Sequence, residues 1–457
     1  MAQQALINLP AELITEIFYH LLSPDPKHLR DYQNFRETCK TIAEATSSAF
    51  KARFFRIRYV MLEKESLLNL VNISRHHILS QAVEVVELCV DHLIQPKDYM
   101  SHEELEICGL KDEYDFFRVR NGEVVLLGDD SWEQIIQTYK DGWQEQTEFF
   151  SQRQHMSYLA IALTNLKNCK AIGISDHTRP WGAFKLGRRI GVLPNRFISD
   201  FLPNSMVHAL VVIRTLFFAL IKSRLPIEEI YIEFGDMMEG CTSVIPRMLS
   251  LPSSLAKAVK SEITTITKLS LVINPKDSDN HFSQEIRKFF AENDPVQEEK
   301  YDWQSDFHSF SSLFPALTDI TLFFNYCEEK QQFPGLSESL YIPLLQRLCL
   351  EYLDCTRDEL LTLLRRHQNT LRRLTLENVK ITTQGLDAWS FLIQTLQNEF
   401  RLDELEIRGC GIDDCDFNID FDLPDRLSAH TSEEMNLLQK EILQVEEEES
   451  LKGSKHR

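Results

Sequence analysis

Apolar residues recur along most of the chain in one short pattern, apolar-x-x-apolar-x-apolar. The last two apolar residues of the pattern are two positions apart, so in a strand their side chains point to the same face. Helical patterns lie between the copies, for example over 358–368 and 385–399. Alternating strands and helices predict an α/β fold with a parallel sheet. Eight copies of the pattern begin at Val85, Cys169, Ile227, Ile266, Leu317, Leu345, Leu371 and Leu402.

The spacing of the copies becomes regular toward the carboxyl end of the chain. The middle apolar residues of the last four copies, Ile320, Leu348, Leu374 and Leu405, are 28, 26 and 31 residues apart. This spacing resembles the period of roughly 20–29 residues of leucine-rich repeats. We therefore expect residues 156–411 to form an irregular leucine-rich-repeat solenoid of short parallel strands and covering helices, with insertions in its first half. An ordinary α/β domain with buried strands is the alternative.

The residues between the inward-pointing apolar ones should face the open, concave side of this sheet. In the six later strands this set holds seven acidic and four basic side chains. Such a mixed polar surface suits a protein or peptide, and it forms no enclosed apolar pocket for a small molecule. We take as candidates for binding a target protein Tyr231, Glu233, Phe323, Arg347, Glu351, Arg373, Glu377 and Arg408.

The first sixty residues follow a helical period instead. Apolar residues at 13, 14, 17, 18, 21 and 22 predict a helix with one buried face, which ends at the prolines 24 and 26. A second helical stretch carries Tyr32, Phe35, Cys39 and Ile42. A third begins near Ala49 and carries Phe50, Phe54, Phe55, Tyr59 and Val60. Three helices this short are stable only when they pack on something else.

Two segments of this region resemble an F-box over residues 5–60. They are Leu9-Pro10-x-Glu12-Leu13-x-x-x-Ile17-Phe18-x-x-Leu21 and Phe35-Arg36-x-Thr38-Cys39-Lys40. The run 50–55 and the stretch 61–70 resemble the continuation found in many filamentous-fungal F-box proteins. The resemblance implies a helical module that binds the Skp-type adaptor of a cullin-RING ubiquitin ligase. The matching positions, and hence the implied adaptor-binding residues, are Leu9, Pro10, Leu13, Ile17, Leu21, Phe35, Cys39 and Ile42. A three-helix cap without a partner is the alternative.

Residues outside these two regions complete the predicted organisation. Residues 61–95 should form a linker helix and the first strand, and 96–155 an insertion with a helix from Trp132 to about Phe150. Residues 412–457 should form an acidic, disordered tail, because 411–450 hold thirteen Asp and Glu against two Lys and Arg. An amphipathic helix over 432–449, with Met435, Leu438, Ile442 and Val445 on one side, is the alternative for this end.

The overall charge changes the choice of partners. The 457 residues carry 49 Lys and Arg against 69 Asp and Glu, a net charge of −20. A protein that binds the phosphate backbone needs a basic face, so we expect no nucleic-acid partner. The most apolar stretch, 207–221, holds His208 and Arg214 and is shorter than the ~20 residues that a bilayer requires. We expect a buried helix there and no membrane partner. No secretory signal is visible, and the ten cysteines form no Cys-x-x-Cys, which is typical of a cytoplasmic or nuclear protein with reduced thiols.

Motifs of catalysis are missing from the sequence. We find no phosphate-binding Gly-rich loop and no Gly-x-Ser-x-Gly. The pair His76 and His77 diverges on a helix, and Cys410 with Cys415 has no second ligand pair, so we expect no metal and no cofactor. The densest basic segment, 185–189 with Arg196 beside Trp181, can bind a phosphate or an acidic peptide, or it is a solvated loop.

These patterns favour a non-catalytic function. We expect a substrate-recognition subunit of a Skp-cullin-F-box ubiquitin ligase, which holds an unidentified protein target near the ubiquitin-carrying enzyme so that proximity supplies the rate. The alternative is a cullin-independent F-box or leucine-rich-repeat scaffold. An enzyme of another fold has no supporting motif.

Overall fold

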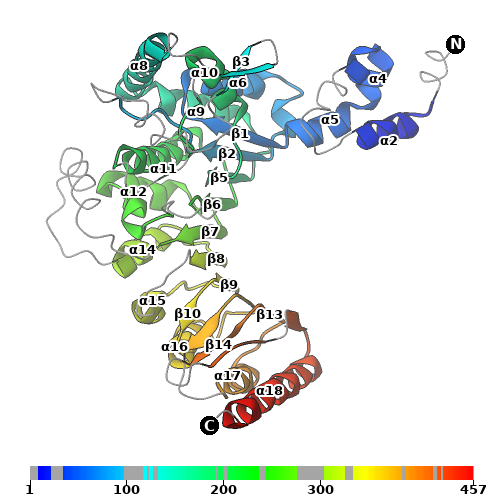
Figure 1. Ribbon diagram of the computed structural model, residues 1–457, viewed down its shortest axis with the longest axis vertical. Coiled ribbons are helices and arrows are strands. Elements are labelled where there is room, and N and C mark those ends of the chain that lie inside the picture. The colour runs from blue at the N-terminus through cyan, green and yellow to red at the C-terminus, as the bar shows by residue number, and fades with distance from the viewer. Residues whose placement is uncertain are drawn as a thin grey trace.

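The protein is an α/β molecule built on one long, mostly parallel sheet (Figure 1). The structure is a computed structural model and describes residues 9–21, 34–96, 117–120, 123–126, 132–191, 193–196, 198, 203–235, 243–274, 303–324, 333–382, 387–414, 419–423 and 426–455. The sheet has ten strands in the order β1-β2-β5-β6-β7-β8-β9-β11-β13-β16. The first nine follow the order of the chain and are parallel, and only β16 is antiparallel to its neighbour. Each unit of the chain therefore stacks on the one before it.

The strands are short and the connections between them are mostly helical. The sheet consists of β1 (Ile57–Met61), β2 (Val85–Cys89), β5 (Ala171–Ser175), β6 (Glu229–Glu233), β7 (Lys268–Ile273), β8 (Asp319–Phe324), β9 (Arg347–Glu351), β11 (Arg373–Glu377), β13 (Glu404–Arg408) and β16 (Arg426–Ala429).

Helices follow nearly every strand. They are α6 (Lys64–Arg75), α8 (Trp132–Ser151), α9 (Gln154–Asn165), α10 (Trp181–Ile190), α11 (Pro203–Ser223), α12 (Ser253–Glu262), α14 (Trp303–Ser311), α15 (Phe333–Ser339), α16 (Arg357–Arg366) and α17 (Ala388–Glu399). Figure 1 shows α11, α12, α14 and α15 along one side of the sheet. Together with the inward side chains of the strands they form one continuous core. The helix predicted from Trp132 is present as α8.

Each of the eight copies of the apolar pattern coincides with a strand of this sheet, as predicted. In the last seven copies the first apolar residue lies two positions before the strand, and in the first copy Val90 follows β2 directly. Their inward residues are buried, and strand pairing sets the middle residues of neighbouring copies side by side, for example Ile320 beside Leu348. The first copy differs in register, because Val86 and not Leu88 pairs with Ile172. A shift of two residues leaves the same face buried, so the period alone does not reveal it.

A strand before the first copy is a correction to the sequence analysis. Tyr59 and Val60 were predicted to continue the third helix, but that helix, α5 (Ser47–Phe54), ends before them. They lie in β1, which pairs with β2 from Ile57 to Met61. The run Arg56 to Val60 has the β-branched and aromatic residues that favour strands, and pairing with β2 buries Val60.

In the last three repeating units the chain changes direction directly after the strand, at one residue with a left-handed backbone that we call the corner. Tyr352, Asn378 and Gly409 follow β9, β11 and β13 directly and have φ angles of 55°, 52° and 54°. A side chain at Gly409 would also lie 2.5 Å from Asn378 Oδ1. The chain then enters a second, smaller sheet of β10 (Asp354–Cys355), β12 (Lys380–Thr382), β14 (Gly411–Asp414) and β15 (Ile419–Asp422). These short second strands were not predicted.

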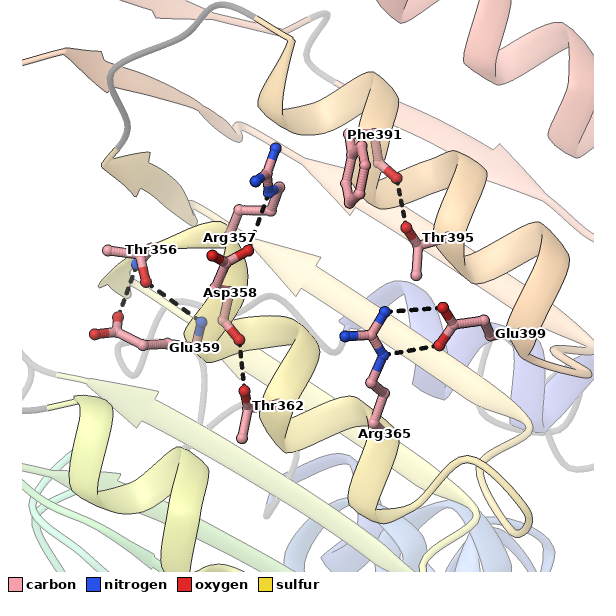
Figure 2. A network of polar contacts seen from close by, with 9 residues as sticks. All are labelled: Thr356, Arg357, Asp358, Glu359, Thr362, Arg365, Phe391, Thr395 and Glu399. Carbon is pink, nitrogen blue, oxygen red and sulfur yellow. Dashed lines mark hydrogen bonds and ion pairs between the residues drawn. The ribbon is translucent and has the colours of Figure 1, made fainter.

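Side chains on the outer helices tie neighbouring units together (Figure 2). Thr356 caps α16 in a capping box with Glu359. The Arg357 guanidinium lies 4.3 Å from the centre of the Phe391 ring on α17. At the other end of the pair, Arg365 donates two hydrogen bonds of 2.8 Å to Glu399. The two helices are thus held at both ends.

The apolar stretch 207–221 forms most of α11, a core helix. Of the described residues, one helix, Ser205–Ser223, has the length and hydropathy of a membrane span, and 72% of that apolar window is buried inside the protein. The prediction of a buried helix is confirmed. Its inward side chains, among them Phe217 and Leu216, join the core of the sheet.

The carboxyl end differs from the expected disordered tail. Residues 412–457 contribute β15, β16 and α18 (Ser432–Lys455), so the alternative of an amphipathic helix describes this end better. Leu438 and Ile442 are buried, and β16 pairs with β13. The reason is physical: strand β13 would otherwise leave an open, apolar sheet end, and the apolar side of α18 with β16 covers it. The burial of the apolar side chains between the acidic ones stabilises this segment more than its net charge destabilises it.

Candidate interaction surfaces

The N-terminal helices form a small module with its own apolar cluster. The module comprises α2 (Ala11–Leu21), a helical turn at 34–37, α4 (Lys40–Ala45) and α5. Phe18 and Ala49 are fully buried, and three phenylalanines pack around them: Phe35, Phe50 and Phe54. This cluster shares no residue with the core of the sheet, and the two meet where the Phe50 ring lies 5.7 Å from that of Phe55.

Polar contacts fix the helices of the module against one another. Thr15 on α2 donates a hydrogen bond of 3.2 Å to the carbonyl of Ala45. Arg36 donates one of 2.8 Å to the Thr46 hydroxyl, and its guanidinium lies 4.1 Å from the centre of the Phe50 ring. Arg36 thus links the helical turn to α5. The second predicted helix, with Phe35, Cys39 and Ile42, is not continuous: the backbone of Cys39 is extended and separates the turn at 34–37 from α4.

The predicted adaptor-binding residues differ widely in exposure. Pro10 is exposed and Leu13 has 51% of its surface exposed. Ile42 is 1% exposed and supports the module from inside, so it offers no contact surface of its own. The side chain of Leu21 lies outside the described residues. The remaining four, Leu9, Ile17, Phe35 and Cys39, are half-buried.

Figure 1 shows the module projecting from the β1 end of the sheet, away from the helices that cover the sheet. The junction is short, because α5 ends at Phe54 and β1 begins at Ile57. Phe55 packs against the sheet core, and the Arg58 guanidinium lies 5.3 Å from its ring centre. Helix α2, which carries Leu13, therefore lies outside the sheet and its covering helices.

The second candidate surface is the face of the sheet opposite the covering helices. Residues alternate between buried and partly exposed along β6, β8, β11 and β13, as the sequence predicts. Of the eight candidate residues on this face, Arg347 and Arg373 are exposed and the other six are partly buried. Two further members of the predicted set, Val272 and Cys349, are buried instead, at 3% and 8% exposure.

Charges on this face are not evenly distributed along the strands. The first row across the strands is balanced, with three acidic and three basic residues in neighbouring positions: Glu229, Lys268, Asp319, Arg347, Arg373 and Glu404. The later two positions of the same strands carry Glu233, Glu351, Glu377 and Glu406, and Arg408 is the basic residue among them. Arg408 contacts Glu406 at 2.7 Å and Glu377 at 3.3 Å. The carboxyl-end half of the face is thus the acidic half.

Tyr231 lies across this face. Its hydroxyl donates a hydrogen bond of 2.8 Å to Glu87 on β2, two strands away. The ring passes over Gly173 of β5, where a Cβ atom would lie 1.8 Å from it, so only glycine fits there. Burial raises the pKa of Glu87, opposed by the hydrogen bond from Tyr231.

Glu351 is the centre of the acidic half. Burial raises its pKa, and the nearby carboxylates of Glu377 and Glu233 raise it further. Phe323, opposite Glu351 on the neighbouring strand, and Tyr352, the residue after Glu351, have ring centres 4.7 Å apart, and Tyr352 is 43% exposed. Phe323 pairs with Glu351 across β8 and β9. Acidic and aromatic residues are therefore neighbours on this face, and Tyr352 was not among the predicted candidates.

A buried polar cluster lies at the carboxyl ends of β2 and β5. Asp91 and Asp176 are each 1% exposed. Arg179 lies 3.6 Å from Asp91, and Arg196 donates to the backbone carbonyls of Asp176 and His177. Burial raises the pKa of Asp91 to about 7, although Arg179 and Arg196 lower it. This cluster holds loops to one another and has little surface to offer.

The basic segment around 185–189 is mostly engaged within the protein. Lys185 forms an ion pair with Glu65, and Arg189 contacts Glu145 at 2.9 Å and Glu63 at 3.9 Å. Trp181 is 57% exposed on the same helix, α10. Lys185 and Arg189 are thus already paired with carboxylates, and Arg196 donates to backbone carbonyls. Most of the positive charge that a phosphate site would need is therefore taken up within the protein.

No group of three or more His, Cys, Asp or Glu side chains that could hold a metal ion is found in the part of the chain that the structure describes. Cys410 is buried, and Cys415 lies outside the described residues. The prediction that His76 and His77 diverge on a helix was wrong: α6 ends at Arg75, and the two rings stack on each other with centres 5.1 Å apart.

No protein-family model matches this chain, and no curated protein matches it.

Proposed function

We propose that this chain is the substrate-recognition subunit of a Skp-cullin-F-box ubiquitin ligase. The N-terminal module is its F-box, which binds the Skp-type adaptor, and the exposed sheet face binds the target protein. One observation carries the proposal: α2 buries Ile14 and Phe18 in the module and still exposes half of Leu13. Half-buried Ile17 lies four residues after Leu13 on the same side of α2. The two leave a contiguous apolar stripe, and such a stripe is a typical contact for a partner.

The arrangement of strands after the N-terminal module supports the interpretation of this part as leucine-rich repeats. Strands stack in chain order, and three consecutive units turn the same corner at Tyr352, Asn378 and Gly409. Cys410 stands at the position where leucine-rich repeats carry Asn or Cys, three residues after the last apolar residue of its strand pattern. The units before β8 are longer and carry insertions.

Such a subunit needs no catalytic side chain. It binds its target on one surface and the adaptor on another, and the ubiquitin-carrying enzyme supplies the reactive thioester. The gain in rate comes from effective concentration at the target lysine. We place the protein in the cytoplasm or the nucleus, with the adaptor and a cullin as partners.

The decisive test changes Leu13 to Lys in the full chain. A charged side chain at an exposed helix position costs the fold little, but it cannot enter an apolar groove. We expect Leu13→Lys to abolish capture of a purified Skp-type adaptor, measured by calorimetry, with an unchanged melting temperature. Leu437→Lys is the matched control, because Leu437 is 65% exposed on α18 and far along the chain from the module.

Unchanged adaptor binding by Leu13→Lys would contradict the assignment of the docking surface. Co-purification separates the proposal from its alternative, a cullin-independent scaffold. Adaptor and cullin together support the ligase, whereas adaptor without cullin supports the scaffold. A chain that binds neither has an N-terminal module that only caps the sheet.

A further inference from the structure

We propose that the target segment bound by the sheet face is basic, with an arginine side chain seated against Glu351 and the rings of Phe323 and Tyr352. This inference rests on the sheet face as the target-binding surface, and it adds the chemistry of the target. We call the site the acidic–aromatic strip, defined by Glu233, Phe323, Glu351, Tyr352 and Glu377.

Charge complementarity selects the occupant. The first row of the face balances its own charges, so it attracts neither sign strongly. The carboxyl-end half has four glutamates against Arg408, which already contacts two of them, Glu377 and Glu406. Glu233 accepts a hydrogen bond from the neutral Ser270 hydroxyl at 2.7 Å, and Glu351 one from the Cys349 thiol at 3.3 Å. These two carboxylates thus meet neutral donors, and a cation is the group that would pair with them.

The environment of Glu351 points the same way. Partial burial and two neighbouring carboxylates make its charged form costly. They raise its pKa even though the hydrogen bond from Cys349 and the charge of Arg408 oppose them. A bound cation removes part of that cost at the moment of binding. Negative groups such as nucleic-acid phosphates or an acidic peptide would add to it, so the strip rejects them.

The two aromatic rings favour the planar guanidinium of arginine over a compact cation. Phe323 and Tyr352 lie 4.7 Å apart with planes tilted by 43°, and both are next to Glu351 along or across the strands. A planar guanidinium stacks on an aromatic face and still donates two parallel hydrogen bonds to a carboxylate. An extended segment can follow the strip across successive strands, which lie about 4.8 Å apart.

The corner at Tyr352 allows a clean test. Tyr352 has a left-handed backbone, and Asn378 occupies the equivalent corner of the next unit. Asparagine tolerates this backbone conformation better than tyrosine does. Tyr352→Asn therefore removes the ring and keeps the corner, including the hydrogen bond of 2.9 Å from its backbone N–H to the Glu377 carbonyl.

The experiment measures binding of the full chain to a short fluorescein-labelled peptide of arginines separated by Gly-Ser, by fluorescence anisotropy. The same peptide with glutamate in place of arginine is the reference. We expect only the arginine peptide to bind. Glu351→Gln should weaken it by about tenfold and Tyr352→Asn by about threefold. Glu404→Gln, the same loss of charge in the balanced row, should change it less than about twofold.

Three results would overturn the proposal: no binding of the arginine peptide at about 1 mM, equal binding of both peptides, or equal losses in Glu351→Gln and Glu404→Gln. Circular dichroism melting of each variant separates lost binding from lost fold. Adaptor capture reports on the other surface. Peptide binding without adaptor capture contradicts only the ligase function, and adaptor capture without peptide binding contradicts only this inference.

Discussion

Asp91 is the side chain whose surroundings depart furthest from those of an ordinary carboxylate. It is 1% exposed, and neither of its oxygens has a hydrogen-bond partner in the described part of the chain. Arg179 at 3.6 Å offsets only part of the cost of burying the charge. The folded protein therefore holds a proton on Asp91 up to a pKa of about 7, whereas the unfolded chain releases it near 4.

This difference predicts how stability depends on pH. A pKa raised by folding adds stability that is complete below about pH 4 and is lost as the pH rises through about 7. Asp91→Asn removes this titration. The free energy of unfolding of the natural protein minus that of the variant should fall by about 1.4 kcal/mol per pH unit between these limits. Urea unfolding at several pH values measures it.

The subtraction matters because nearby histidines act in the opposite direction. Burial lowers the pKa of His92 to about 4 and that of His208 as well. They lose stability as the pH falls, in both proteins alike, so the difference cancels them to first order. A difference that stays flat from pH 4 to 7 would show that Asp91 is ionised in the fold.

At the level of the element, the carboxyl end provides the sharpest contrast between composition and packing. Its charge count predicted disorder, yet α18 places Met435, Leu438 and Ile442 against the sheet. Glu446, itself 4% exposed, accepts hydrogen bonds from the backbone N–H groups of Trp389 and Ser390 at 3.0 and 3.3 Å. One of the acidic residues therefore caps the start of α17.

Two adjacent leucines of α18 test this packing with the same substitution. Leu438 is 4% exposed and Leu437 is 65% exposed. We expect Leu438→Ala to lower the free energy of unfolding by about 2–5 kcal/mol, through lost burial and the cavity it leaves. Leu437→Ala should stay within about 0.5 kcal/mol. Chemical denaturation measures both, and equal effects would mean that α18 does not pack on the sheet.

The same contrast explains which elements the sequence could predict. Strands with a repeated apolar pattern, such as those around Leu348 and Leu374, were found because the period of two reports burial directly. The strand β1 has Arg58 where its neighbour has Val86, so it lacks the pattern and was missed. The second strands such as β12 are too short to show any period. The left-handed corners before these strands could not be predicted, because two of them are formed by Tyr352 and Asn378 and not by glycine.

At the scale of the whole molecule, the sequence predicted which segments form the two surfaces. It did not predict how charge is distributed on the sheet face or which residues of α2 are exposed. Alternation placed Glu233, Phe323 and Glu351 on one face, but only pairing across strands separates the balanced row from the acidic half. Tyr352 comes to this face through the corner and not through the strand period. Likewise, the helical period of α2 does not distinguish exposed Leu13 from buried Ile14, which only packing against α4 and α5 decides.

The separate cluster of the N-terminal module predicts how the molecule unfolds. Phe18 lies in the module's cluster and Phe217 in the core of the sheet, both fully buried, and the clusters share no residue. Because a short junction near Phe55 connects them, loss of one should cost the other little.

We expect Phe18→Ala to increase amide hydrogen exchange in α2, α4 and α5 and to abolish adaptor binding, while exchange in β6 and binding of the arginine peptide stay unchanged. Phe217→Ala, which deletes the same ring from the larger core, should increase exchange in β6 and destabilise the sheet by about 3–5 kcal/mol. Faster exchange in β6 caused by Phe18→Ala would mean that the module and the sheet fold as one cooperative unit, and that its exposed leucine belongs to that unit's surface.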